Sequence, residues 1–268
     1  MRLSIFDVEH GACALLVCDN NTRLMIDCGH NATTGWRPGS YLRNSGVSVL
    51  DMLAITNYDE DHVSGIADLC DRIDVRSLWR NKSVDSSVIR SLKSSDGMGP
   101  GIERLTREIT NTFTVSGTAP QPVFAGLERL AFYNDYPAFD DENNLSMVVF
   151  LKCHGIGVMF PGDLERAGWL ALLRQPSFQQ ALRETNVLVA SHHGRQSGCC
   201  EEVFKLCNPF YVVISDKGYM HDTQETVPFY RGVAKGGPFR SEKERRVLTT
   251  RNDGVIHFNF RPGAWNAE

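Results

Sequence analysis

The feature that most restricts how this chain can fold is a polar loop placed directly after an apolar segment. Residues 49–56 (VLDMLAIT) have the composition of a buried strand, and the loop TNYDEDHVSG follows at residues 56–65. The loop brings Asp59, Asp61 and His62 close together. Neighbouring carboxylates repel one another and are costly to bury, and a bound cation would relieve both costs. Carboxylate oxygen and imidazole nitrogen are suitable ligands for zinc, manganese or magnesium.

The same loop has a simpler interpretation. A helix is predicted from about Val63 to Ile73, and Asp61 is a residue type that commonly caps the start of such a helix. A solvated acidic loop that only caps this helix would need no metal. The loop alone does not decide between the two interpretations.

Later segments favour the metal site because they repeat the same layout. An apolar run is followed by an acid or a histidine in FPGDLE at residues 160–165 and in VLVASHHG at residues 187–194. A third apolar run, at residues 211–215, also leads into polar residues. The polar residues that follow these three runs are Asp163, His192, His193, Lys217 and His221. Functional groups commonly gather at strand ends on a rigid scaffold, so we expect these residues to meet. The alternative for the paired histidines is a pair satisfied within the core.

The remaining pattern predicts an α/β fold in which helices cover two sheets, an αββα arrangement. Strands are expected at residues 3–8, 13–18, 23–27, 78–79, 127–133, 145–152, 156–160, 186–190, 210–215, 247–250 and 254–260. Helices are expected at residues 102–111, 164–174, 177–184 and 226–234. No Pro- or Gly-rich linker divides the chain, so we predict a single domain over residues 1–268. Residues 80–125 are predicted to be a helical insertion that could cap a site.

Composition narrows the class of partner. The net charge is −4 with a pI of about 6.1, so the chain lacks the overall basic character that proteins gripping long nucleic acids usually have. The segment KGGPFRSEKERR at residues 235–246 could touch phosphates, although a mixed-charge solvated surface is the favoured interpretation. No apolar run is long enough to span a membrane, and no signal peptide is recognisable. We therefore expect eight reduced, mostly buried cysteines in a cytoplasmic protein.

Taken together, the motifs resemble one known superfamily. In chain order they are DVEHG (7–11), LMIDCG (24–29), TNYDEDHVSG (56–65), NNLSMVV (143–149), FPGDLE (160–165), ASHHG (190–194) and RNDGVI (251–256). This order resembles the metallo-β-lactamase superfamily, and within it the soluble hydrolase domain of the ComEC/Rec2 competence proteins. The resemblance implies a four-layer αββα sandwich with metal ions at one edge of the two sheets.

The resemblance also assigns ligands to one metal site. Asp61, His62, Asp163 and His192 match that site, and Asp163 matches the carboxylate that bridges two ions. His193 is adjacent, where it could bind the metal or support a ligand. We expect this site to hold a divalent metal firmly.

A second site is expected to be weaker. Asp59 matches one of its ligands, but Asn57 stands where the family has its first histidine, and Asn144 where other branches place a further histidine. An amide oxygen is a weaker donor than imidazole for zinc or manganese. The second position would therefore be oxygen-rich and would favour manganese or magnesium over zinc, with Asn57 and Asn144 at most contacting substrate.

The function implied is metal-assisted hydrolysis. The metal would lower the pKa of a bound water, Asp59 or Asp61 would orient that water and take a proton, and His221 would donate a proton or hold a phosphate. Lys217 could neutralise developing charge. The implied substrate is a phosphodiester in nucleic acid or in a cyclic or short nucleotide. The alternatives are a degenerate binding or regulatory subunit, and a thioester or lactone hydrolase. A partner protein, unidentified, is also expected.

Overall fold

Two β-sheets form the centre of the protein in the computed structural model, which describes residues 1–94, 97–114, 121–218 and 225–268. The larger sheet has the strand order β14 (Glu242–Arg245), β13 (Gly237–Phe239), β17 (Ala264–Ala267), β16 (Ile256–Arg261), β1 (Arg2–Ile5), β2 (Ala14–Val17), β3 (Arg23–Ile26), β5 (Met52–Ala54) and β7 (Leu78–Trp79). The smaller sheet has the order β15 (Val247–Thr249), β12 (Tyr211–Ile214), β11 (Thr185–Val189), β10 (Ile156–Phe160), β9 (Val148–Cys153) and β8 (Leu127–Phe132). Two short strands, β4 (Val49–Leu50) and β6 (Asp74–Val75), pair separately.

Alternation along the strands explains why the two sheets stack. In β2, Ala14 and Leu16 pack into the core that the two sheets share, whereas Leu15 packs on the opposite face. In β9, Val149 faces the shared core and Val148 the opposite side. Side chains of a strand point alternately to the two faces of its sheet, and strands that are apolar on both faces must be covered on both.

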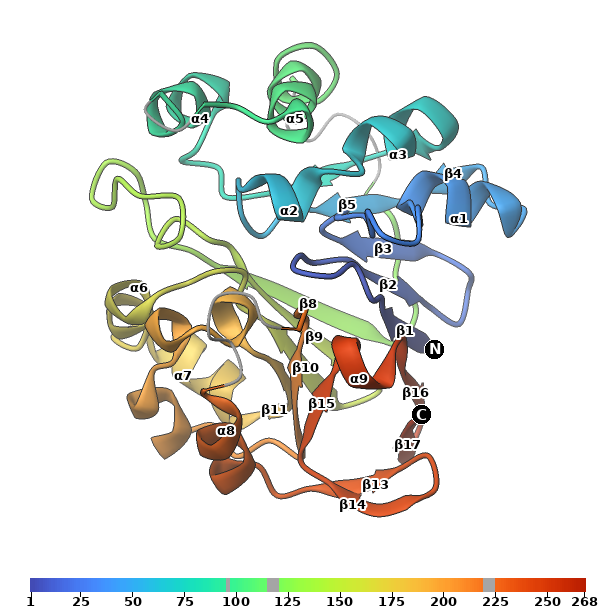
Figure 1. Cartoon of the computed structure of the whole chain (residues 1–268), viewed down its shortest axis with the longest axis vertical. Helices are drawn as coiled ribbons and strands as arrows, with labels where there is room; N and C mark the ends of the chain where they lie inside the picture. The colour runs from blue at the N-terminus through green and yellow to red at the C-terminus, as the bar shows by residue number, and fades with distance from the viewer. Residues whose placement is uncertain (95–96, 115–120, 219–224) are drawn as a thin grey trace.

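Helices supply the two outer layers (Figure 1). On the larger sheet these are α1 (Pro38–Asn44), α2 (Glu60–Val63), α3 (Ile66–Arg72), α4 (Ser86–Leu92) and α5 (Pro100–Asn111), which share one apolar cluster with that sheet. On the smaller sheet they are α6 (Arg166–Leu172), α7 (Pro176–Arg183) and α8 (Val227–Val233). A short helix, α9 (Thr250–Asp253), follows β15. The four-layer αββα arrangement predicted from the sequence is confirmed.

The direction of the strands positions a site at one edge. β3 runs parallel to β5 in the larger sheet, and β10, β11 and β12 run parallel to one another in the smaller sheet. The carboxyl ends of parallel neighbours meet at the same edge, and ligands commonly bind outside such ends in open α/β sheets. The loops after these five strands contain the polar motifs found in the sequence.

Several predicted boundaries are corrected by the structure. The helix expected at residues 63–73 is two helices, α2 and α3, and the break lies at Gly65, whose N–H donates to the Cys28 carbonyl at 2.8 Å instead of to a carbonyl of the preceding turn. The strand expected over residues 49–56 is broken at Asp51, whose carboxylate accepts the Arg23 N–H at 2.8 Å. Helix α1 and strands β13, β14 and β17 were not predicted.

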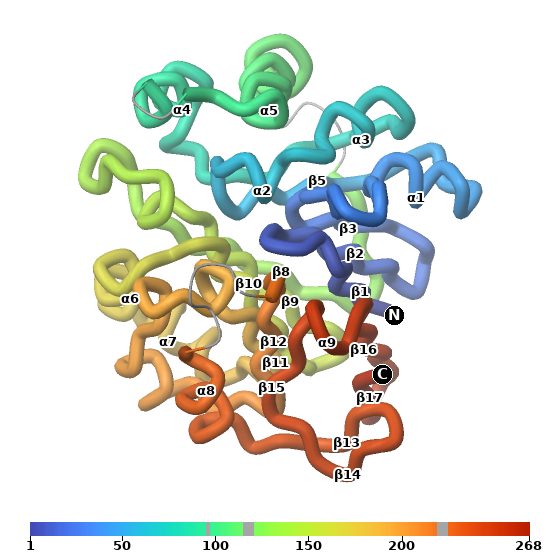
Figure 2. Tube along the Cα trace, viewed as in Figure 1, coloured from blue at the N-terminus to red at the C-terminus, as the bar shows by residue number. Residues whose placement is uncertain are grey.

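The predicted insertion contains two helices that lie over the polar loop. α4 and α5 pack on each other, and α5 contacts α2, as Figure 2 also shows. The Glu60 carboxylate accepts the N–H groups of Gly101 at 2.9 Å and Ile102 at 3.1 Å, which ties the start of α5 to the loop. Among the described residues, no helix is both long and apolar enough to cross a bilayer.

Candidate metal centre

Four side chains from three strand ends converge at this edge, and we call them the candidate centre. Asp61 and His62 follow β5, Asp163 follows β10, and His193 follows β11. Ligand atoms of His62, Asp163 and His193 all lie within 4.8 Å of one another, and all three residues are buried. The acids and histidines that the sequence predicted at strand ends therefore do meet, and they come from both sheets.

His62 has one ring nitrogen fixed and the other turned toward the centre. Its Nδ1 lies 2.9 Å from Oδ2 of Asp27, a carboxylate from the end of β3 that also accepts the Thr56 N–H at 2.7 Å. A carboxylate cannot donate, so Nδ1 carries the hydrogen, and Nε2 is the ring nitrogen that would bind a cation. Nε2 lies 2.9 Å from Oδ1 of Asp163. A carboxylate that accepts the second ring N–H of a histidine, as Asp27 does here, is the usual support for a metal ligand.

His193 is oriented in the same way by a different group. Its Nδ1 lies 3.0 Å from the carbonyl oxygen of Ser215, at the end of β12, so Nδ1 must be the donor. Its Nε2 is buried and makes no hydrogen bond to any residue that the structure describes, although carboxylate oxygens of Asp61 and Asp163 lie at 3.3 and 3.5 Å. A buried ring nitrogen surrounded by carboxylates at these distances fits a cation between them.

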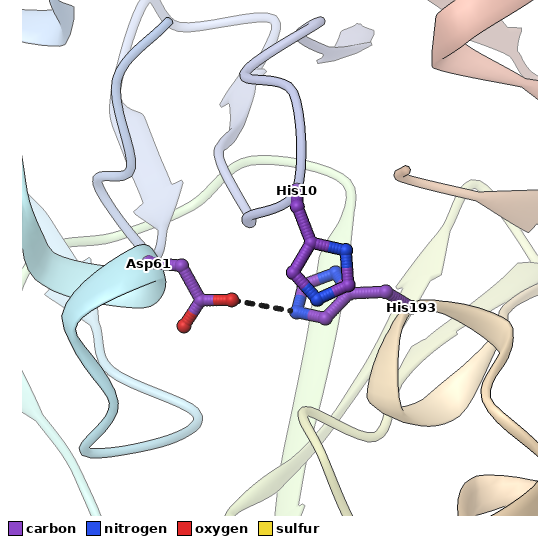
Figure 3. Close-up of side chains that lie close together, drawn as sticks. All are labelled: His10, Asp61 and His193. Carbon is purple, nitrogen blue, oxygen red and sulfur yellow. Dashed lines mark ion pairs between the residues drawn. The ribbon is translucent and has the colours of Figure 1, made fainter. Parts of the chain in front are cut away.

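Figure 3 shows the ion pair between Asp61 and His193, with the imidazole of His10 beside that of His193 and tilted by 49° against it. The rings of His10 and His193 have centroids 4.4 Å apart, and ligand atoms of His10, Asp61 and His193 lie within 4.8 Å of one another. His10 comes from the DVEHG motif, between β1 and β2. A third imidazole, which the sequence analysis did not assign to the site, therefore lies beside Asp61 and His193.

The electrostatics of the centre also favour a cation. Burial raises the pKa of Asp61, but His193 and His62 outweigh it and lower the pKa to about 2. Burial would likewise raise the pKa of Asp163, but the same imidazoles lower it below its usual range. Burial would lower the pKa of His62, whereas Asp163 and Asp27 raise it well above its usual value. The buried carboxylates thus stabilise positive charge here, and a divalent metal bound by these carboxylates and imidazoles would supply it.

His192, which the resemblance assigns to the same site, is held differently. Its Nε2 accepts a hydrogen bond from Nη1 of Arg195 at 2.9 Å, and its Nδ1 lies 3.3 Å from Glu165. A guanidinium can only donate, so the Nε2 lone pair of His192 is already engaged. Burial lowers the pKa of His192, and the charge of Arg195 adds to this effect. Its Nε2 lies 3.9 Å from Asp163, so the geometry favours His193 over His192 as the metal ligand.

The residues predicted for a second metal site form a different arrangement. Asn57 is fully buried; its Oδ1 accepts the Asp59 N–H at 2.7 Å and its Nδ2 donates to Ser146 Oγ at 3.0 Å. The Asp59 carboxylate forms an ion pair with Lys93, which also pairs with Glu142 at 2.8 Å. Of the residues that the structure describes, an ammonium and no ring nitrogen pairs with Asp59.

Three further residues that the sequence predicted for the site are not among the side chains of the candidate centre. Asn144 uses its amide within the fold, because Oδ1 accepts the Gly168 N–H at 2.8 Å and Nδ2 donates to Asp141 at 3.1 Å. Lys217 is half exposed and pairs with Glu9 at 3.1 Å. His221 lies outside the described residues. The expectation that Asn144 contacts substrate therefore gains no support from its position.

Sequence reasoning missed four groups that shape the site, namely Asp27, His10, Lys93 and Arg195. Asp27 was visible in the LMIDCG motif, at a strand end like the other acids, and could have been found by the same argument. Arg195 directly follows the ASHHG motif, which was a weaker signal. No sequence signal marked Lys93, which comes from the predicted insertion.

Comparison with known proteins bears on the fold. No family model matches the chain. A curated relative, ComE operon protein 3 of Bacillus subtilis (strain 168), is 24% identical over 232 residues, which is 82% of this chain and 26% of the relative. The chain thus spans about a quarter of that relative's length.

Solved structures resemble the chain over nearly its whole length. One, a protein of Parabacteroides distasonis assigned as a metal-dependent hydrolase, has a TM-score of 0.50 at 11% identity and covers 93% of each chain. Another, a protein of Thermotoga maritima assigned as a Zn-dependent hydrolase of the metallo-β-lactamase superfamily, has a TM-score of 0.46 at 12% identity, over 92% of this chain and 97% of its own. Together with the two stacked sheets and their helical layers, the similarity to the Parabacteroides distasonis protein shows that the two chains share the αββα fold.

Proposed function

We propose that this protein is a metal-dependent hydrolase that cleaves a phosphodiester in a short or cyclic nucleotide. The observation that carries the proposal is the pair of imidazoles, His62 and His193, whose Nδ1 atoms are both engaged and whose Nε2 atoms both face Asp163. His62, His193 and Asp163, with Asp61 beside them, would hold the metal. A divalent metal bound there would lower the pKa of water and polarise a phosphoryl oxygen.

The chain's own residues supply the other requirements of the reaction. Asp61 is the carboxylate best placed to orient an attacking water and accept its proton, because Asp59 is already paired with Lys93. Arg195 places a permanent positive charge beside the centre, donating to His192 at 2.9 Å and to His10 at 3.1 Å. Its buried Nε has no hydrogen-bond partner within the described part of the chain. A guanidinium with an unused donor suits an anionic oxygen such as that of a phosphate.

Surface charge favours a small substrate over a long duplex. The net charge is −4, and two of the three arginines in the 235–246 segment, which could have bound a nucleic-acid backbone, are already paired with acids. Arg245 pairs with Glu242 and with Asp253 at 3.0 Å, and Arg246 pairs with Glu244 at 2.9 Å. Binding of long nucleic acid depends mainly on unpaired basic groups that neutralise phosphates.

The proposal is tested by incubating the metal-loaded protein with cyclic dinucleotides, short RNA and DNA, plasmid, and bis-p-nitrophenyl phosphate, each in manganese, magnesium and zinc. We expect metal-dependent cleavage of the reporter and of at least one short or cyclic nucleotide, and loss of that cleavage in Asp163→Asn. Arg195→Gln should raise KM for the phosphodiester more than it lowers kcat.

The competing function is a binding or regulatory subunit that has the fold without the activity. Metal binding without cleavage of any phosphodiester would favour that function. Cleavage of thioester or lactone reporters in place of phosphodiesters would favour the alternative that the protein is a thioester or lactone hydrolase. The ComEC/Rec2 resemblance is supported within this proposal by the alignment with ComE operon protein 3.

A further inference from the structure

The place where the fold family would bind a second metal ion is built around a lysine. Lys93 follows α4 in the predicted insertion, and its side chain is only 7% exposed. It forms ion pairs with two carboxylates, Asp59 and Glu142, from segments far apart in the sequence. A buried lysine is costly unless it is paired, so this position is a specific feature of the fold and not a surface contact.

Hydrogen bonds connect Asp59, which pairs with this ammonium, to the candidate centre. The Asp163 N–H donates to Ser146 Oγ at 3.1 Å, and Ser146 also accepts from Asn57, whose Oδ1 accepts the Asp59 N–H. Asp59 is therefore linked to Asp163 through two short hydrogen-bonded side chains.

The residues around Asp59 do not fit a second metal ion. Asn57 stands at the position of the family's first histidine, and its amide is already used within the loop. No imidazole among the described residues forms a hydrogen bond or an ion pair with Asp59. The positive charge that a second ion would bring is supplied by Lys93, which neutralises one of the two negative charges of Asp59 and Glu142.

We propose that this protein binds a single metal ion and that the ammonium group of Lys93 permanently occupies the position of the second. The inference rests on the metal centre of the proposed function. It assigns the predicted insertion a role, which is to deliver a fixed cation beside the metal through α4. It also replaces the expectation of a weak, oxygen-rich second site built on Asp59.

The test is a count of bound ions. Metal-free protein is titrated with manganese up to millimolar concentration, and the electron paramagnetic resonance signal of free Mn²⁺ reports how many ions are bound per chain. We expect one ion in the wild type. Lys93→Met keeps the length of the side chain, removes its charge and leaves two carboxylates unpaired, so it should bind two ions.

Two variants serve as controls. Lys93→Arg keeps a cation in this position and should still bind one ion, and Lys82→Met removes an exposed lysine from the same segment and should also bind one. Circular dichroism and thermal unfolding of each variant confirm that the fold is retained.

Each outcome has a distinct consequence. Two ions in the wild type, or a folded Lys93→Met that still binds one, would overturn the assignment of Lys93 while leaving the proposed hydrolase function in place. A wild type that binds no ion would overturn both. If Lys93→Met does not fold, the number of ions bound by the wild type and by Lys93→Arg still tests the proposal. A second bound ion in either protein would contradict it.

Discussion

The two histidines of the turn Ser191–Gly194 differ in which ring nitrogen is already engaged. Both have left-handed backbone conformations, with φ of 52° at His192 and 53° at His193, an uncommon arrangement for two consecutive non-glycine residues. Such conformations persist where the surrounding structure holds them, and they cluster at functional sites. The turn directs the ring of His193 toward Asp163 and Asp61, whereas the ring of His192 accepts a hydrogen bond from Arg195.

This difference predicts unequal effects of the two histidines on metal binding. His193→Ala removes a ligand and should weaken zinc or manganese binding by more than the roughly 10–100-fold that loss of a supporting partner costs. His192→Ala should change the affinity by only a few-fold, because its Nε2 lone pair already accepts from Arg195. Isothermal titration calorimetry measures both. Equal losses in the two variants would contradict the assignment.

Asp27 orients His62 and should act on the metal without touching it. Asp27→Asn keeps the shape of the side chain, but its neutral oxygen is a weaker acceptor for the Nδ1–H of His62 and its amino group can be the one that faces the ring. We expect metal affinity to fall by roughly 10–100-fold. Asp74→Asn, an exposed site on β6, is the control and should leave affinity unchanged. An Asp27→Asn protein with wild-type affinity would show that this support is unnecessary.

At the scale of elements, two glycines let the loop after β5 pack against its neighbours. A Cβ on Gly11 would lie 2.6 Å from the Asp61 carbonyl oxygen, and one on Gly29 would lie 2.4 Å from the same atom. Both distances are shorter than any ordinary contact, so the DVEHG and LMIDCG motifs end in glycine for a steric reason. The backbone of the metal-binding loop is thus held between the segments that follow β1 and β3.

The close approach at Gly29 predicts a loss of stability on substitution. Gly29→Ala should lower the free energy of unfolding by about 1–3 kcal/mol, as overpacking usually does, because the clash is with backbone that cannot rotate away. Gly232→Ala in α8, where an added Cβ meets nothing within 4 Å, should be neutral or stabilise by up to about 1 kcal/mol. Urea denaturation measures both. A neutral Gly29→Ala would contradict the packing argument.

At the same scale, the sequence predicted most of the long elements and missed those without a strong pattern. Apolar runs identified β9, β10 and β12 of the smaller sheet, because these strands are buried on both faces. Strands β13, β14 and β17 are short and lie toward one edge of the larger sheet, where polar residues alternate with few apolar ones. Helix α1 has only seven residues and begins with Pro-Gly, so its sequence resembles a turn.

For the whole molecule, the sequence predicted which strand ends carry the site but not how their side chains pair. Asp61, His62, Asp163 and His193 are brought together across both sheets. Whether His192 or His193 faces the metal depends on which acceptor each Nδ1 or Nε2 meets, and that is set by the backbone of one turn. The contact of Lys93 with Asp59 joins segments 34 residues apart through the insertion, so no local pattern could reveal it.

A bound metal should stabilise the whole fold, because its ligands come from both sheets and exist together only in the folded state. At a free metal concentration of 100 times Kd, the free energy of unfolding should rise by about 2.7 kcal/mol. Differential scanning fluorimetry of protein stripped with a chelator and then reloaded with zinc or manganese measures the change in Tm. No change in Tm at saturating metal would contradict a site that links the two sheets.

The central claim is that His62, His193 and Asp163 hold one metal ion, and anomalous X-ray diffraction from crystals grown with zinc tests it most directly. We expect a single anomalous peak at the candidate centre, about 2.0–2.1 Å from Nε2 of both His62 and His193, with Asp163 as an oxygen ligand. We expect no second peak beside Asp59. A peak that is absent from these two nitrogens, or that lies on His192 instead, would contradict the account.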